Sequence, residues 1–226
     1  MEKFFHAIKI VSLVTMLIVT FFLVKTLKQA SFMPIHLIRV FGDLRYINEY
    51  ELAEEILPQA KGFFSTNVKA LQQTLAAMPW IDQVNVEKRW PAKLLIEVIE
   101  QKPLAIFNNN AVINLRGELI FVNVQQMPRN TLPLLLGYDY ELPAMLVFFK
   151  LLQDELNKVN LSVTKLENKV DIGWQATLNN NIKLVIGRDD LAARIKRFVG
   201  LFKTKQDLLP NVRTVDLRYN NGVAIG

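Results

Sequence analysis

An uninterrupted apolar run near the N-terminus constrains the fold of this chain more than any other feature. Ile10 to Val24 contains no charged side chain. Its only polar members carry hydroxyl groups: Ser12, Thr15 and Thr20. A helix that crosses the roughly 30 Å apolar core of a bilayer needs about 20 mostly apolar residues, and flanking lysines can reach water through their stems. The run therefore predicts a single transmembrane helix at residues 10–30, preceded by a short cytoplasmic tail at 1–9.

Two alternatives remain open for this segment. A cleaved signal peptide requires small residues just before its cleavage site. For a cleavage site at Ala30, one of the positions that needs a small residue is occupied by Lys28. A buried helix of a soluble protein would show a polar stripe at helical spacing, which the run lacks. Basic residues are nearly balanced across the run, so their count does not decide the orientation. Because the N-terminal tail is so short, we expect it to be cytoplasmic, as in a single-pass type II protein.

The composition excludes several kinds of chemistry. The chain has no cysteine, which excludes disulfides, thiolate catalysis and cysteine zinc sites. Its only histidines, His6 and His36, lie near the N-terminus, which excludes a Ser-His-Asp triad in the body of the chain. Two pairs of adjacent carboxylates have structural explanations. Glu54-Glu55 is expected on the solvated face of a helix, and Asp189-Asp190 at a helix N-terminus, where negative charge is favourable. We expect no enzyme activity, no cofactor, no metal site and no small-molecule substrate.

The net charge of +6 does not indicate a nucleic-acid partner. Half of it comes from the first 30 residues, where four lysines outnumber one glutamate. The remainder is spread along the chain without a basic run or an arginine-rich arm. We therefore expect no nucleic-acid binding.

Residues 33–103 are predicted to form a small unit of strands and helices. Short apolar or alternating segments predict strands at 36–41, 84–86 and 94–98, with a turn at 90–93. Two helices are expected between the first strand and the second. The order strand, helix, helix, strand, strand predicts a three-stranded mixed sheet with both helices on one face.

The two helices of this unit have recognisable start signals. Asn48 and Glu51 have the spacing of a capping box, and Pro58 stops the helix after Leu57. Ser65 and Thr66 are expected to cap the second helix. Its apolar residues are Val68, Leu71, Leu75 and Met78.

Residues 104–226 are predicted to form a second, strand-rich unit with two helices. The helices are expected at 142–156 and after Asp189. The expected strands are 105–107, 111–115, 119–122, 174–178, 182–186, 215–219 and 223–225, with a loop or strand at 132–137. The predicted apolar face of the last helix consists of Leu191, Ile195, Phe198 and Phe202. Three basic residues are expected to lie mostly outside this face: Arg194, Lys196 and Arg197.

Several motifs carry a family resemblance. The first unit contains Met78-Pro79-Trp80-Ile81, then Val84-x-Val86-x-Lys88-Arg89-Trp90-Pro91-x-x-Leu94-x-Ile96, then Glu100-x-Lys102-Pro103-x-Ala105. This pattern resembles the polypeptide-transport-associated (POTRA) domain of the bacterial FtsQ/DivIB cell-division family. The second unit resembles the same family through Trp174-Gln175-x-x-Leu178-x-x-x-Ile182-x-Leu184-x-Ile186-Gly187-Arg188 and Val215-Asp216-Leu217-Arg218-Tyr219-x-x-Gly222-x-Ala224.

The sequence departs from the family pattern at a few positions. Asn114 stands where the family usually has Asp, Phe107 where it often has Trp, and Tyr138 where Pro commonly follows the glycine. Relatives usually continue beyond the position of Gly226, so contacts made by such an extension are in doubt. The resemblance otherwise covers nearly the whole chain and implies an α+β protein. Its expected order is a single transmembrane helix, a POTRA domain (β-α-α-β-β) at 33–103 and an FtsQ-type domain at 104–226.

The resemblance also implies a function. It suggests a non-catalytic scaffold of the divisome in the cell inner membrane at the division septum, with its bulk in the periplasm. The implied partners are the small bitopic proteins FtsB and FtsL and other membrane proteins of the divisome. In the family the POTRA domain serves recruitment to the septum, and the residues here that would carry this are Val68, Gln83, Val86 and Lys88.

Two other functions fit the sequence less well. An outer-membrane biogenesis or secretion component uses POTRA domains to chaperone polypeptides, but it predicts tandem POTRA units and a barrel, whereas this chain has one unit and no barrel pattern. A membrane-tethered hydrolase is contradicted by the missing cysteine and scarce histidine.

The terminal hairpin is the predicted partner site. A final strand at 223–225 is expected to lie at a sheet edge, and it carries no lysine or proline to block strand addition. An incoming strand would then bond to the backbone of Val223, Ala224 and Ile225, beside the ring of Tyr219. Arg218 would meet an acidic partner residue or simply be solvated. The open alternative is that another segment of the chain covers this edge. The predicted contact residues are Leu217, Arg218, Tyr219, Asn221, Gly222, Val223, Ala224 and Ile225.

Overall fold

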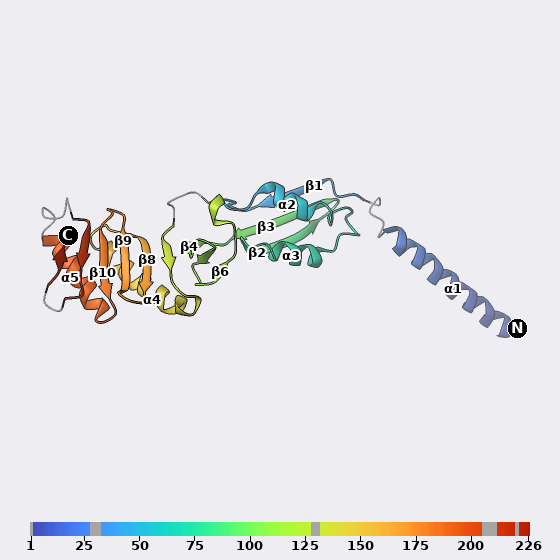
Figure 1. Cartoon of the computed structure of the whole chain (residues 1–226). Coiled ribbons are helices and arrows are strands. Elements are labelled where there is room, and N and C mark those ends of the chain that lie inside the picture. The colour runs from blue at the N-terminus through green and yellow to red at the C-terminus, as the bar shows by residue number, and fades with distance from the viewer. Residues whose placement is uncertain (1, 28–32, 128–131, 205–211, 220–221) are drawn as a thin grey trace. The chain divides into compact units, whose positions relative to one another are not determined.

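A computed structural model describes residues 2–27, 33–127, 132–204, 212–219 and 222–226 (Figure 1). Contacts divide the chain into two compact units, Met1–Gln101 and Lys102–Gly226. Helix α1 spans Glu2–Leu27 within the first unit, and each unit contains its own hydrophobic core.

Helix α1 has the length and composition of a membrane span. Its segment Ile8–Thr26 has a mean hydropathy of 2.2, and none of it is buried. Two of its threonine hydroxyl groups bond within the helix: Thr15 Oγ1 donates to the Val11 carbonyl and Thr20 Oγ1 to the Met16 carbonyl, each at 2.8 Å. These bonds remove the need for water at the hydroxyl groups, so they do not prevent the helix from entering an apolar phase.

The remainder of the first unit has the predicted order of elements. Strand β1 is followed by two helices and an antiparallel pair of strands, and the sheet order is β1-β3-β2, with β1 parallel to β3. The bounds are β1 Leu37–Phe41, α2 Glu49–Ile56, α3 Val68–Ala76, β2 Ile81–Arg89 and β3 Lys93–Glu100. The alternation of buried and exposed residues along β2 and β3 directs one face of the sheet into the core. The mixed three-stranded sheet is therefore confirmed.

The helix starts differ from those predicted. The side chain of Asn67, and not Ser65 or Thr66, caps α3 by accepting the Ala70 N–H at 3.2 Å. The hydroxyl groups of Ser65 and Thr66 instead donate to the Gly62 carbonyl. Hydroxyl residues and asparagine both serve as caps, so the sequence alone did not distinguish two adjacent candidates.

Asn48 caps α2 as expected, but through a different bond. Its side chain accepts the Tyr50 N–H at 2.9 Å, so the bond goes to the second residue of the helix and not to Glu51. The loop before α2 is held by another carboxylate. Glu100 at the end of β3 accepts the backbone N–H groups of Arg45, Tyr46 and Ile47. This loop is therefore fixed against the end of β3.

The second unit is built on one long mixed sheet. Its nine strands lie in the order β12-β11-β10-β9-β8-β7-β4-β5-β6. The bounds are β4 Pro103–Phe107, β5 Ala111–Asn114, β6 Leu119–Ile120, the short helix η1 Val124–Gln126, β7 Leu134–Leu136, η2 Asp139–Glu141, α4 Leu142–Asn157, β8 Val163–Lys169, β9 Gly173–Leu178, β10 Lys183–Gly187, α5 Leu191–Thr204, β11 Thr214–Asp216 and β12 Ala224–Ile225. The predicted strand-rich domain with two α-helices is confirmed for the described residues.

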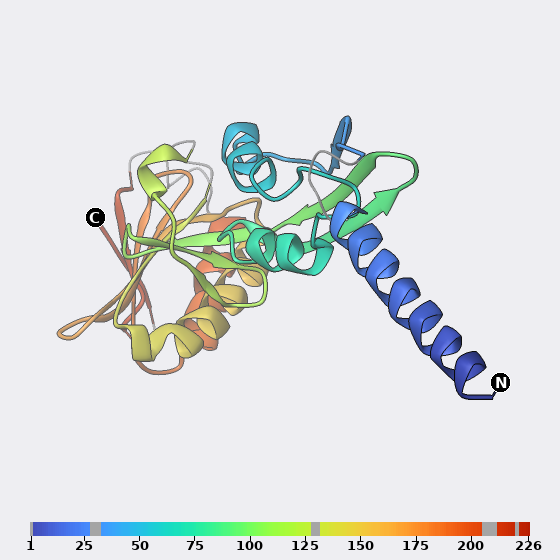
Figure 2. The same ribbon diagram turned by 90° about the vertical axis from the view of Figure 1, so that its right-hand side faces the viewer.

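The two helices of this unit pack against each other and against the sheet. Helix α4 contacts β8, and α5 contacts β10 (Figures 1 and 2). Their apolar faces meet side chains from the central strands in a single core. Its largest fully buried members are Phe107, Ile113, Leu135, Met145, Leu152, Leu156, Leu166 and Phe198.

Three details of the second unit depart from the sequence analysis. Strand β8 was not predicted, because a register shift between Val163 and Lys165 breaks its alternation. Strand β11 ends at Asp216, whereas a strand was expected to reach Tyr219. Arg194 was expected off the apolar face of α5, but it is only 7% exposed.

Candidate partner-binding edge

Strand β12 forms one edge of the nine-stranded sheet. It pairs antiparallel with β11, with Val215 opposite Ile225 and Asp216 opposite Ala224. On the other side of β11 lies β10, which continues the sheet. Among the described residues no strand pairs with the outer side of β12.

The hydrogen-bond pattern shows which backbone groups face outward. Thr214 and Gly226 exchange N–H···O bonds of 2.8 and 3.0 Å. In an antiparallel pair, bonded residues alternate, so the backbone of Ala224 faces β11 while Val223 and Ile225 face away. No described residue bonds to the outward groups of Val223 and Ile225. The backbone of Ala224, which we had expected to bond to an incoming strand, is thus directed into the sheet.

The side chains of the hairpin fall into an inner and an outer set. Leu217 is buried and Val223 packs against the core, so both support the hairpin from within. Tyr219 and Ile225 are 57% and 46% exposed and offer apolar surface near the edge. Gly222 is half-buried, and Asn221 lies outside the described residues.

Two arginines of α5 hold the segment that leads into β12. The guanidinium of Arg197 donates to the carbonyl groups of Tyr219 and Gly222 at 2.6 and 3.2 Å. Arg194 donates to the carbonyl groups of Ile186 and Arg218 at 2.7 and 3.3 Å. The helix therefore fixes the backbone on both sides of residues 220–221 and positions the edge.

Gly187 makes room for the buried arginine. It has a φ of +87°, and a Cβ built on it would collide with the guanidinium of Arg194. The absence of a side chain at this position allows Arg194 to reach the Ile186 carbonyl at the end of β10. Sequence reasoning missed this arrangement. Its only signal was a glycine-arginine pair at the end of a predicted strand followed by two arginines three residues apart.

Arg218 has a partner within the chain. Its guanidinium bonds to the carboxylate of Asp216, with Nη2 and Oδ2 separated by 2.6 Å. This hydrogen bond lowers the pKa of Asp216 and raises the pKa of Arg218. The bonds to Asp216 use Nε and Nη2, so Nη1 of this exposed side chain bonds neither to Asp216 nor to another carboxylate of the described residues.

Comparison with known proteins identifies the family. Residues 33–101 match the family model described as "POTRA domain, FtsQ-type", and residues 105–218 match "Cell division protein FtsQ/DivIB, C-terminal". The chain is 34% identical to the cell division protein FtsQ of Shewanella oneidensis over 206 residues, which cover 89% of this chain and 77% of that protein. The chain belongs to the FtsQ/DivIB family.

Other FtsQ/DivIB relatives align over similar lengths. The FtsQ of Aliivibrio fischeri is 30% identical, over 86% of this chain and 76% of the relative. The FtsQ of Escherichia coli is 28% identical, over 95% of this chain and 80% of the relative. Membership in this family assigns the chain to bacterial cell division, and α1 is consistent with a membrane-anchored member.

The residues that the FtsQ/DivIB resemblance assigned to POTRA recruitment do not form one exposed patch. Val86 is 4% exposed and packs in the core, and Val68 is half-buried at the start of α3. Gln83 is exposed, but the register of β2 places it on the sheet face opposite Val86 and Lys88. The Lys88 ammonium lies over the Phe63 ring, 5.7 Å from its centre, and burial lowers the pKa of Lys88. Lys88 and Gln83 therefore present different faces of β2 to a partner.

The described part of the chain holds no group of three or more His, Asp or Glu side chains arranged to bind a metal ion. Its ion pairs are local and mostly exposed, as between Arg116 and Glu118 or Lys158 and Glu155. Such pairs contribute little to stability.

Proposed function

We propose that this chain is a non-catalytic scaffold of the divisome, anchored in the inner membrane by α1. In this proposal the N-terminus is cytoplasmic and both folded units lie in the periplasm at the division septum. Family membership supports the divisome role, and the length and hydropathy of α1 support the anchor. The observation that carries the proposed binding role is the outer side of β12, where Val223 and Ile225 direct backbone groups away from the sheet.

The proposed partners are FtsB and FtsL, which would bind in the periplasm. A segment of one of them would add to β12 as a further strand, so that its backbone pairs with Val223 and Ile225. Tyr219 and Ile225 would supply apolar contacts beside the added strand, and the arginines of α5 would keep the edge in place before binding. A preformed edge lowers the ordering cost of binding.

The alternative of an outer-membrane biogenesis or secretion component receives less support. One POTRA model matches the chain, and the region after it matches the C-terminal domain of FtsQ/DivIB. That order of domains favours the division scaffold.

The proposed edge is tested with two proline variants. Ile225→Pro removes an outward N–H, so we expect it to reduce co-purification of FtsB and FtsL with the detergent-extracted chain at least tenfold. Ile225→Val retains that N–H and a branched side chain, so it should bind nearly as the native chain does. Ala224→Pro removes an inward N–H and should also weaken the pairing of β12 with β11.

Circular dichroism and thermal unfolding serve as the controls for folding. Ile225→Pro should unfold close to the native temperature because the bond it removes lies outside the sheet. Native-like recovery of both partners with folded Ile225→Pro would exclude strand addition at β12.

A further inference from the structure

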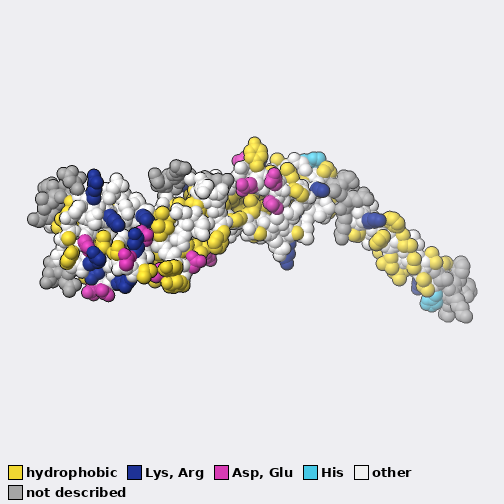
Figure 3. Space-filling model, viewed as in Figure 1, with side chains coloured by type: hydrophobic (Ala, Val, Ile, Leu, Met, Phe, Trp, Pro, Cys, Tyr) yellow, Lys and Arg dark blue, Asp and Glu magenta, His cyan; other side chains and the backbone are white. Residues whose placement is uncertain are grey.

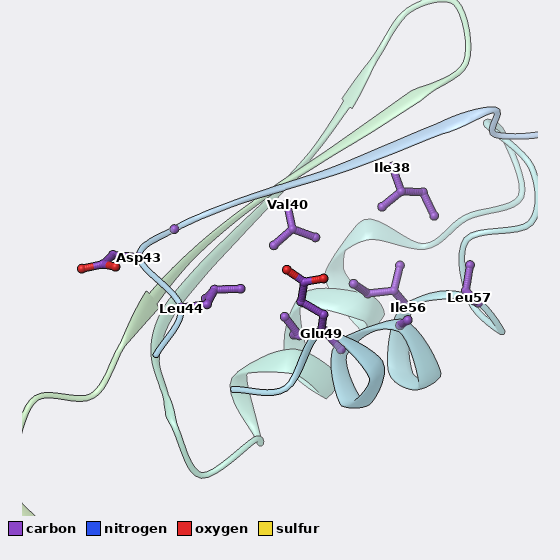
Figure 4. A pocket seen from close by; sticks show the side chains of 10 residues that line it. Ile38, Val40, Asp43, Leu44, Glu49, Ile56 and Leu57 are labelled. Atoms are coloured by element: carbon purple, nitrogen blue, oxygen red, sulfur yellow. The ribbon is translucent and has the colours of Figure 1, made fainter. Parts of the chain in front are cut away.

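A second open sheet edge, on the POTRA unit, is flanked by a groove. The groove lies between β1 and α2 and has a volume of about 620 Å³. Ile38 and Val40 point from β1 toward α2, and Glu49 points from α2 toward β1 (Figure 4). The apolar lining of the groove includes Leu44, Leu52, Ala53, Ile56 and Leu57.

The backbone of β1 offers hydrogen bonds beside this groove. Just after β3, Gln101 donates its N–H to the carbonyl of Trp80, the residue before β2. Backbone groups alternate in direction along a strand, so those of Leu94 and Ile96 on β3 point toward β1. The parallel register places Ile38 beside Leu94. The backbone groups of Leu37, Arg39 and Phe41 therefore face β3. The N–H and C=O groups of Ile38 and Val40 point away from β3, and no described residue bonds to them.

The chain itself shows that this side of the edge accepts an extended segment. Just before β1, Pro34 forms an antiparallel bridge with Gly62. Two backbone bonds hold it, from the Ile35 N–H to the Lys61 carbonyl at 3.3 Å and from the Phe63 N–H to the Met33 carbonyl at 2.8 Å. The bridging segment then leaves for α3, and the edge beyond it is unpaired among the described strands. The outward set changes after Ile35, because the His36 N–H donates to the Ala92 carbonyl at 3.1 Å and the register also turns Leu37 toward β3, so an added strand would pair with Ile38 and Val40 beyond this irregularity.

The charge around the groove selects among partners. The ten lining residues include the carboxylates of Asp43 and Glu49 and no lysine or arginine. Helix α2 carries four glutamates and no basic residue, and Figure 3 shows acidic side chains gathered over it. Asp43 pairs with Arg45, but no ion pair to any glutamate of α2 occurs in the described chain.

The nearest cation on β1 does not neutralise the groove. Arg39 alternates with Ile38 and Val40, so its side chain leaves the opposite face of the sheet. There its guanidinium lies over the Phe41 ring, 5.8 Å from its centre. Within the described part of the chain, the groove therefore combines an apolar floor, an unpaired strand edge and an acidic rim without a basic partner on α2.

We propose that this groove binds an extended segment of a partner protein in which basic side chains alternate with apolar ones. The segment would add to β1 as a strand and bond to the backbone of Ile38 and Val40. Its apolar side chains would enter the groove over Leu52 and Ile56, and its basic residues would lie near Glu49 and the other glutamates of α2. This site lies at the sheet edge opposite β2, so it is separate from the recruitment residues Gln83 and Lys88.

The test uses the full chain in detergent micelles and two labelled ten-residue peptides. One peptide alternates valine with lysine and the other alternates valine with glutamate. We expect fluorescence anisotropy to show saturable binding of the lysine peptide and at least tenfold weaker binding of the glutamate peptide. Equal binding of the two peptides, or no saturable binding of either, would overturn the proposal.

Charge variants place the peptide in the groove. Glu49→Lys should weaken the lysine peptide about tenfold and Glu49→Gln about threefold, because the charge lies on an exposed rim. Glu97 is an exposed carboxylate of β3 that the register places on the face opposite the groove, so Glu97→Lys and Glu97→Gln are matched controls with little expected effect. Equal losses at the two positions would mean a nonspecific charge effect and would reject the site.

Two proline variants separate this edge from β12. Val40→Pro removes an outward N–H of β1 and should abolish measurable peptide binding while the chain keeps its circular dichroism spectrum. Ile225→Pro alters the edge of the other unit and should bind the peptide as the native chain does. Loss of binding in Ile225→Pro with retention in Val40→Pro would assign the peptide to β12 and reject the groove. If Val40→Pro does not fold, the variants of Glu49 and Glu97 decide the outcome.

Discussion

At the residue scale, the position of the terminal hairpin depends on arginines that contact it from α5. Arg194 is buried and bonds to carbonyl groups that lie in two different segments, at Ile186 and Arg218. A buried carbonyl that loses its donor retains the full cost of leaving water. The stability of the hairpin therefore depends on a residue remote from it in sequence.

We expect Arg194→Met to lower the free energy of unfolding by about 1–3 kcal/mol, because both carbonyl groups lose their donor while the methionine fills part of the space. Lys196→Met, on the exposed side of the same helix, should change it by less than about 0.5 kcal/mol. Urea unfolding of the full chain, followed by circular dichroism, measures both. Equal stabilities of the two variants would contradict a structural role for Arg194.

The pair Asp216 and Arg218 predicts a dependence on acidity. The guanidinium of Arg218 lowers the pKa of Asp216 below its ordinary value of 3.8, so the folded state holds this carboxylate ionised more strongly than the unfolded state does. The stabilisation is fully present above pH 3.8. It is lost as the pH falls through the lowered pKa, because protonation then breaks the ion pair.

We therefore expect Asp216→Asn to be less stable than the native chain near neutrality and to differ from it less at a pH well below 3.8. Urea titrations at both pH values provide the comparison. A stability difference that stays constant between them would show that Asp216 does not contribute through its charge.

At the scale of elements, periodicity predicted most of both units and local capping chemistry predicted less. The apolar spacing in α3 and the alternation in β3 each depend on one element and its buried face, so both were visible in the sequence. Strand β8 was missed because a register shift hides its alternation. The choice between Ser65 and Asn67 as cap depends on where the backbone turns, which neighbouring segments decide.

The corrected cap of α3 leads to a prediction. Asn67→Ala should destabilise the first unit by about 1 kcal/mol, because the Ala70 N–H loses its acceptor. Ser65→Ala removes a hydroxyl that bonds only to a loop carbonyl and should cost much less. Thermal unfolding of the two variants ranks them, and a larger loss in Ser65→Ala would identify Ser65 as the cap of α3.

The candidate site was only partly predictable at this scale. The terminal strand has the composition of an open edge, and the sheet order places β12 at an edge. Which of its backbone groups face outward required the pairing of Thr214 with Gly226, because a shift of one residue exchanges the two sets. The support from Arg194 and Arg197 arises from helix packing, which periodicity along one helix does not reveal.

At the scale of the whole molecule, the proposed function requires α1 to remain attached and to cross the membrane. Reporter fusions placed after residue 35 should be active only when the reporter requires the periplasm, because α1 would carry the following chain across. N-terminal sequencing of the membrane-extracted protein should find the residues that precede α1. A mature protein that begins near Ser31 would instead identify the segment as a cleaved signal sequence.

The contact between Gly187 and Arg194 makes the order of mutations at these two sites matter. A side chain at Gly187 would collide with the guanidinium, so Gly187→Ala meets both a steric clash and an unfavourable φ while Arg194 is present. Once Arg194 has been shortened, the collision with its guanidinium disappears, and a close approach to the Arg218 Cγ at 3.1 Å and the backbone strain remain. The two substitutions are therefore non-additive: Gly187→Ala should cost less stability in a chain whose Arg194 has already been shortened than in the native chain.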